Sequence, residues 1–213
     1  MTSFEQQPAD ILTRLAELRS TDAPTHGGHV LSYVYDPGLA ELDELAADAA
    51  KLMQPVNGLD PTTFGSVAAL ERELLGFVRG LLHGDSDVVG TVTTGGTESC
   101  LLAVKTARDA WALSHDGTPR LVMPVTAHAA FQKAAHYFGL TLDLVPVSAE
   151  GVVAADDIAS RLGDDVALVV VSAPSYPVAV LDPVVAVAEL TSARAATAPT
   201  RPSARRRTCA GRR

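Results

Sequence analysis

Long apolar runs, cysteines and lysines are the features that this sequence has little of. No apolar run reaches about 18 residues in the 213-residue chain, so we expect no membrane-spanning helix. Acids and the lack of an apolar segment near the N-terminus argue against a secretory signal. The two cysteines, Cys100 and Cys209, stand in unrelated contexts. They form no disulfide framework and indicate a cytoplasmic protein.

Charge is distributed unevenly along the chain. All 25 acidic residues precede residue 191, whereas residues 191–213 contain seven arginines and no acid. An acidic body repels nucleic acid, while the arginine-rich segment alone could attract nucleic acid or acidic lipid. We therefore expect no nucleic-acid partner, and a basic-tailed interaction protein stays as one alternative.

Hydrophobic periodicity predicts three regions. Residues 1–55 are expected to form an N-terminal arm with helices near 11–18 and 39–53. Residues 56–190 are expected to form the main domain, which begins with a helix at 66–82. Residues 191–213 have no periodicity and almost no large apolar residue, so they are expected to be disordered.

Strands and helices alternate in the rest of the main domain. The expected strands are 88–93, 120–126, 140–148 and 165–174, and the expected helices are 97–113, 128–139, 154–162 and one that starts at 182. This alternation predicts an α/β fold with a mainly parallel sheet and helices on both of its faces.

The segment TVTTGGTESC, residues 91–100, is the strongest candidate for a binding loop. A loop between a strand and a helix presents free N–H groups at the positive end of the helix, which suits a phosphate. Gly95 and Gly96 allow close approach and positive φ, and Thr94, Thr97 and Ser99 offer hydroxyls. The alternative is a tight turn in which glycine only aids packing.

Known nucleotide-binding patterns do not match this loop. The P-loop and the Rossmann fingerprint are both absent, so a small phosphorylated cofactor fits better than a nucleotide. The carboxylate of Glu98 suits the helix N-terminus but repels phosphate. We therefore expect Glu98 to point away, toward a partner subunit or the substrate.

Four segments carry a resemblance to a known family. They read QPVNGLDPTTFGSVAALERELL from residue 54, TTGGTESCLLAVKTARD from residue 93, HAAFQKAAHYFGL from residue 128 and VVVSAPSYPVAVLDPV from residue 169. In this order they resemble the pyridoxal-phosphate (PLP) lyases of the group II decarboxylase superfamily. The resemblance is greatest to its sphingosine-1-phosphate lyase-like branch. It runs from about residue 29 to residue 190.

The resemblance implies a fold, a cofactor and a reaction class. The fold is a partial large domain of PLP-dependent transferase fold type I, and complete relatives are homodimers. The implied activity is a PLP-dependent lyase that decarboxylates an amino acid or cleaves a phosphorylated amino alcohol by a retro-aldol step. The sequence does not separate these two substrates.

The resemblance also assigns roles to individual residues. Gly95, Gly96 and Thr97 are expected to bind the cofactor phosphate, and His128 to stack on the pyridine ring. Ser172 either contacts the cofactor or caps its own loop, and Asn57 lies near the substrate or the dimer interface. His26 and His29 alone are weak metal ligands, so no metal is expected.

Two catalytic groups of the family have no counterpart in this chain. The three lysines are Lys51, Lys105 and Lys133, and none occupies the position of the family's Schiff-base lysine. No acid follows Glu189, where the family places the acid that pairs with the pyridinium nitrogen. One hypothesis is a truncated chain whose residues after about 192 are frameshifted. The alternative function is then a catalytically inactive fragment.

Overall fold

The computed structural model describes residues 7–30 and 36–197. The chain divides into two compact units, residues 1–91 and residues 92–213. This boundary differs from the predicted one at residue 55. The reason is that helix α3 (Gly65–Leu81), which the sequence assigned to the main domain, contributes no residue to either hydrophobic core cluster.

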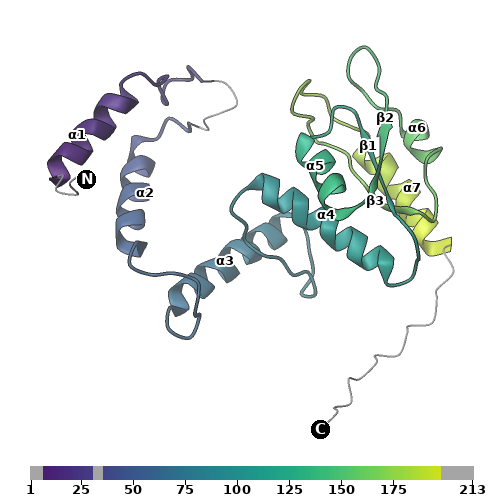
Figure 1. Cartoon of the computed structure of the whole chain (residues 1–213), viewed down its shortest axis with the longest axis horizontal. Helices are drawn as coiled ribbons and strands as arrows, with labels where there is room; N and C mark the ends of the chain where they lie inside the picture. The colour runs from purple at the N-terminus through teal and green to yellow at the C-terminus, as the bar shows by residue number, and fades with distance from the viewer. Residues whose placement is uncertain (1–6, 31–35, 198–213) are drawn as a thin grey trace, which may run out of the picture. The chain divides into compact units, whose positions relative to one another are not determined.

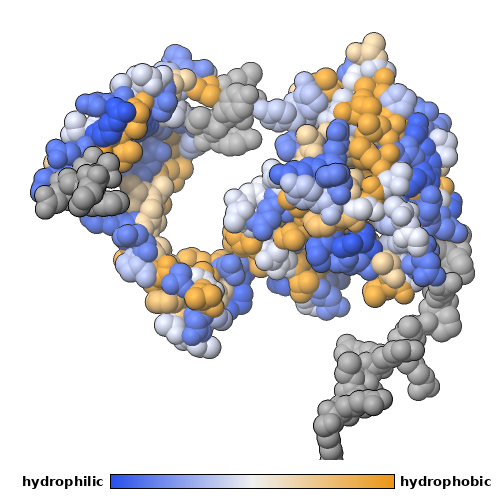
Figure 2. Space-filling view, in the orientation of Figure 1, coloured by the Kyte–Doolittle hydropathy of each residue, from blue (hydrophilic) through white to orange (hydrophobic). Residues whose placement is uncertain are grey.

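The first unit contains helices only, in the part of it that the structure describes. They are α1 (Pro8–Arg19), α2 (Ala40–Met53) and α3, as the periodicity predicted. None of the three buries a residue. Their large apolar side chains lie exposed, as the apolar colour on this unit shows in Figure 2.

The second unit is built on a parallel sheet. Its strands are β1 (Arg120–Pro124), β2 (Thr141–Val145) and β3 (Val166–Val169), in the order β2-β1-β3. Both neighbours of β1 run parallel to it, and Leu121 pairs with Leu142 on one side and Leu168 on the other. The predicted parallel sheet is thus confirmed.

Helices cover both faces of this sheet, also as predicted. The four helices are α4 (Gly96–Ala112), α5 (Ala129–Phe138), α6 (Ala155–Ala159) and α7 (Val184–Thr197). Leu121 and Met123 of β1 pack in one core cluster with α4 and α5, whereas Val122 packs in the other with α6 and α7. Alternate side chains of a strand point to opposite faces, so β1 supplies both cores. Figure 1 shows the two helix pairs on either side of the strands.

One predicted strand is absent, and one predicted helix end differs. Residues 88–93 form no strand, and Val89 is 91% exposed. A strand needs a hydrogen-bonded neighbour, and none of the three strands pairs with this segment. Helix α7 also continues to Thr197, past the predicted start of disorder at residue 191. Alanine and arginine are good helix formers, so a lack of large apolar residues did not end the helix. Residues 198–213 lie outside the described residues.

The edge of the sheet where the strands begin is held by ion pairs. Arg120 donates to both carboxylate oxygens of Asp165, at 2.7 and 2.8 Å, and to Asp143 at 2.5 Å. Arg161 pairs with the other oxygen of Asp143. This network joins the start of β1, the first half of β2 and the residues before β3, so it fixes the strands relative to one another.

We expect this network to make stability depend on pH. The hydrogen bonds from Arg120 hold the pKa of Asp165 below its usual value. A lowered folded-state pKa stabilises the protein above the unfolded value of about 4, and this stabilisation is lost as the pH falls below it. Asp165→Asn should therefore lower the urea midpoint at pH 7 and reduce its drop between pH 7 and pH 3. Asp157→Asn, on the exposed side of α6, is the control and should leave both unchanged. An equal drop in wild type and Asp165→Asn contradicts this account.

Candidate functional site

Three segments of the second unit meet at the edge of the sheet where the strands end. The loop from β1 to α5 and the loop from β3 to α7 both start there. At its other end, α4 is anchored to the opposite edge, because Trp111 donates its indole N–H to the carbonyl of Asp164, at 2.8 Å. A helix of 17 residues is about 25 Å long, so the start of α4 reaches the edge where the strands end. We therefore expect Gly95, His128 and Ser172 to lie toward the same edge.

The strand order marks the same place as a binding crevice. After β1 the chain forms α5 on one face, and after β3 it forms α7 on the other. These two strands are neighbours, so their connections separate to opposite faces. In open α/β sheets, ligands bind at the carboxyl ends of the strands at such a point. From this topology we expect a ligand to bind at the edge that carries His128 and Ser172.

The glycine loop leaves its amide groups open to solvent. The first hydrogen bond of α4 runs from Ser99 N–H to Gly95 C=O, at 3.1 Å, so the N–H groups of Gly96, Thr97 and Glu98 precede the intrahelical ladder. Neither Gly95 nor Gly96 has a left-handed φ, contrary to the prediction. Instead, a Cβ placed on either glycine meets no heavy atom within 4 Å. The space beside both glycines is therefore open, and a Cβ at either position would meet no neighbour.

The Glu98 carboxylate is bound within its own loop, and its expected direction, away from a bound phosphate, stays a prediction. Its Oε2 accepts hydrogen bonds from the N–H and the hydroxyl of Thr94, both at 2.7 Å. The Thr94 amide is the main cause of the lowered pKa of Glu98, and the Thr94 hydroxyl is the next. The carboxylate thus closes the loop onto the first turn of α4 and stays ionised.

Only one of the three hydroxyls proposed for the phosphate is available. The Thr94 hydroxyl is bound to Glu98, and the Ser99 hydroxyl lies 2.7 Å from that of Thr93. The Thr97 side chain is exposed and makes no hydrogen bond within the described part of the chain. Thr97 therefore combines an open N–H with an open hydroxyl.

His128 is held in place as the N-cap of α5. Its Nδ1 accepts the N–H of Ala130 at 3.1 Å, which fixes the ring orientation and leaves Nε2 as the outward nitrogen. The residue is exposed at the edge where β1 ends. This confirms a helix N-terminal position, while stacking on a cofactor stays a prediction.

Ser172 and Asn57 both have local backbone roles. The N–H of Ser172 donates to Asp182 at 2.7 Å. This bond does not involve the Ser172 side chain, so contact with the cofactor and capping of its own loop both stay predictions. Asn57 accepts the N–H of Leu59 at 3.0 Å, as a turn residue does. Asn57 belongs to the first unit, so its predicted role near the substrate stays a prediction.

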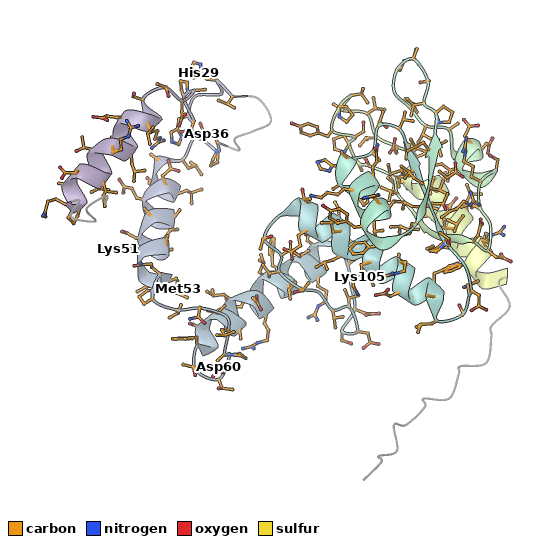
Figure 3. The ribbon with its side chains drawn as sticks, viewed as in Figure 1. His29, Asp36, Lys51, Met53, Asp60 and Lys105 are labelled. Carbon is orange, nitrogen blue, oxygen red and sulfur yellow. The ribbon has the colours of Figure 1, made fainter. Side chains whose placement is uncertain are left out.

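The lysines lie on helix surfaces. Lys51 is on α2 and Lys105 on α4, as Figure 3 shows. The Lys105 ammonium pairs with Asp109 at 2.7 Å, and that of Lys133 lies 5.4 Å from the centre of the Tyr137 ring. The ammonium groups of Lys105 and Lys133 thus each contact a side chain of their own helix.

The sequence reasoning missed three buried polar side chains at the same edge. Thr126 Oγ1, Ser175 Oγ and Asp182 Oδ1 are buried without a hydrogen-bond partner among the described residues. Thr126 follows β1, and the other two belong to the loop after β3. The sequence DP at 182–183 signalled a helix start, but no pattern indicated that the aspartate is buried.

Within residues 7–30 and 36–197, no group of histidine, cysteine and acidic side chains could hold a metal ion. No helix in this part of the chain is long and apolar enough to cross a membrane.

Comparison with known proteins identifies the family. The model of the aminotransferase class-V family matches residues 74–198, which include the glycine loop and all three strands. The chain belongs to the aminotransferase class-V family. The members that it resembles are lyases and decarboxylases, and they indicate pyridoxal phosphate as the cofactor of the family.

The relatives agree with the predicted branch. Sphingosine-1-phosphate lyase 1 of Mus musculus is 37% identical over 85% of this chain. A probable L-aspartate decarboxylase of Haloarcula marismortui is 36% identical over 68% of it. The structure of the Burkholderia pseudomallei sphingosine-1-phosphate lyase superimposes with a TM-score of 0.82 at 27% identity over 92% of this chain. This likeness confirms the predicted fold type I.

The chain spans only part of these relatives. It covers 32% of the mouse lyase, 40% of the Haloarcula decarboxylase and 47% of the Burkholderia structure.

The closure of the glycine loop by Glu98 can be tested directly. Glu98→Ala removes the acceptor of the Thr94 N–H, so hydrogen exchange at that amide should speed up several-fold. Glu98→Gln retains an acceptor oxygen and should keep most of the protection. The control is Thr94→Val, which removes the hydroxyl but leaves the hydrogen bond from the residue-94 N–H to Glu98. Unchanged exchange in Glu98→Ala, measured by NMR, means that this bond does not hold the loop.

Proposed function

We propose that this chain forms the phosphate-binding part of a PLP-dependent carbon–carbon lyase. The observation that carries the proposal is the start of α4, where open amides and the Thr97 hydroxyl face free space beside Gly95 and Gly96. The helix dipole adds a partial positive charge at this point. Because His128 lies at the same edge, phosphate and ring of one small cofactor can be bound together.

Each residue has a distinct task in this proposal. The amides of Gly96 and Thr97 and the Thr97 hydroxyl donate to the phosphate. His128, held by its bond to the Ala130 amide, presents its ring to the face of the pyridine. When bound, PLP supplies an electron sink for the bond that breaks at or next to the carbon bearing the substrate nitrogen.

Two substrate classes fit this chemistry. One is an amino acid that loses its carboxylate, as the name of the Haloarcula relative suggests. The other is a phosphorylated amino alcohol cleaved by a retro-aldol step, as the names of the mouse and Burkholderia relatives suggest. The match to the mouse lyase covers more of this chain, 85% against 68%, which favours the second. Asn57 is proposed to contact the substrate or a partner subunit.

A second candidate function is cofactor binding without turnover. PLP enzymes need a lysine that bonds to the cofactor and an acid beside its ring nitrogen. The three lysines of this chain lie on helices, two of them with their ammonium groups engaged. This polypeptide on its own is therefore proposed to bind PLP through the phosphate and to turn over no substrate.

We also propose that the chain forms a homodimer in the cytoplasm, without nucleic acid. The support for the dimer is the exposed apolar stripe on each helix of the first unit. On α2 it consists of Leu42, Leu45 and Leu52, which are 45%, 63% and 77% exposed. Side chains of this size are rarely left in water in such numbers. The support for the cytoplasm, a reducing compartment, is that Cys100 is a free thiol.

The phosphate site is tested by two threonines of the same loop. Thr97→Val removes the open hydroxyl, and PLP affinity should fall about tenfold, as expected for a lost hydrogen bond to a charged group. Thr94→Val is the matched control, because its hydroxyl already serves Glu98, and it should change affinity less than about twofold. Binding is followed by PLP absorbance with inorganic phosphate as competitor. Equal losses in the two variants, or no saturable binding to wild type, contradict the proposal.

The dimer is tested on α2. Leu45→Glu places a charge in the apolar stripe and should convert the dimer to monomer at micromolar concentration. Ala47→Glu puts the same charge on the opposite side of the helix, so it should remain dimeric. Light scattering after size-exclusion chromatography measures the mass. A monomeric wild type, or equal masses for both variants, excludes α2 as the interface.

A further inference from the structure

The loop between β3 and α7 forms one wall of the candidate site and contains two buried polar side chains. Ser175 is 1% exposed and Asp182 is 5% exposed. Val122 pairs with Val169, and the Val170 N–H donates to the Val122 carbonyl, so the chain that continues to Ser172 leaves the sheet beside the end of β1. His128 follows shortly after in the neighbouring loop. The residues of this wall therefore stand beside the proposed position of the cofactor.

Asp182 joins the two ends of this loop. Its Oδ2 accepts the N–H of Ser172 at 2.7 Å, and its own N–H donates to the Ser172 carbonyl at 3.0 Å. Inside the loop, the Ser175 N–H donates to Val180 at 2.8 Å. The segment is thus closed by hydrogen bonds at its base and in its middle, although it has no regular secondary structure.

A second contact holds the same loop from the side of β2. Gly151, at φ +84°, lies in the turn after β2, and a Cβ placed there would come within 2.7 Å of Val178 Cγ2. Only glycine allows this approach, because the turn also needs a left-handed backbone. The wall is therefore fixed by two independent contacts, one polar and one steric.

The bond to Ser172 uses only one of the two carboxylate oxygens of Asp182. Oδ1 is buried with no partner among the described residues, and the same holds for Ser175 Oγ. A buried carboxylate costs free energy unless its charge is compensated. Asp182 lies two residues before Val184, the first residue of α7, and the partial positive charge at the start of a helix favours a carboxylate there. Buried polar atoms without partners are rare in native proteins and concentrate where a structure serves a function.

We propose that Asp182 is a positioning residue for the cofactor site. By binding the Ser172 amide it holds the end of β3 at the level of the loop that carries His128, so that the cofactor meets a preformed wall. The negative charge of Asp182 lies just before the start of α7, where the helix dipole favours it. This inference rests on the proposed function, because the wall matters only if PLP binds at this edge.

The experiment compares two replacements of Asp182 with an aspartate at the opposite edge. Asp182→Ala removes the acceptor, so exchange of the Ser172 amide should speed up at least tenfold and PLP affinity should fall about tenfold. Asp182→Asn keeps an acceptor oxygen and should restore both to within about threefold of wild type. Asp165→Asn is the control for general destabilisation, since it weakens the ion pairs with Arg120 but should leave PLP affinity unchanged.

Exchange is measured by NMR without PLP, and affinity by PLP absorbance. If Asp182→Ala does not fold, Asp182→Glu replaces it, because its oxygens reach one methylene further and should disturb the Ser172 amide in the same way. An unchanged Ser172 amide in that variant overturns the inference, as does an equal loss of affinity in Asp165→Asn. Failure of wild type to bind PLP contradicts the proposed function instead, and the exchange data still decide whether Asp182 holds the loop.

Discussion

The parallel sheet is the constraint on which the rest of the second unit depends. Because β1, β2 and β3 run in one direction, every loop that follows a strand lies at the same edge. The anchoring of Trp111 at the other edge then brings the start of α4 to these loops. This places the start of α4, the N-cap His128 and the buried Asp182 toward one edge, although they lie far apart in the sequence. Their chemistry follows from this placement.

The two edges of the sheet differ in their charges. At the edge where the strands begin, Arg120 and Arg161 are paired with aspartates, and this network secures the register. At the other edge, positive potential comes from backbone amides and a helix dipole, while the carboxylates of Glu98 and Asp182 hold the loops. Under the proposed function, backbone amides rather than a mobile cation bind the anion, which suits a small phosphate group.

Much of the fold follows from the sequence, and the failures have physical causes. Strands and helices from Arg120 to Val187 were predictable because β-branched runs and one-sided helices are local patterns. Residues 88–93 read as a strand too, but strand formation depends on a partner that periodicity cannot supply. The glycine loop and His128 were predictable from motifs. The engagement of Thr94 by Glu98 is a local contact between residues four apart, and it was missed because the carboxylate was expected to avoid a phosphate. The burial of Asp182 depends on tertiary contacts that the sequence spacing does not signal.

The central claim is that the start of α4 binds the phosphate of PLP while no lysine of this chain bonds to the cofactor. The most direct measurement is to add PLP to the purified protein, reduce with borohydride and map the lysines by mass spectrometry, with pyridoxal as the partner lacking phosphate. The account predicts saturable binding of PLP, weaker binding of pyridoxal, and no specific reduced adduct. A stoichiometric adduct on Lys51, Lys105 or Lys133, or equal binding of PLP and pyridoxal, would contradict it.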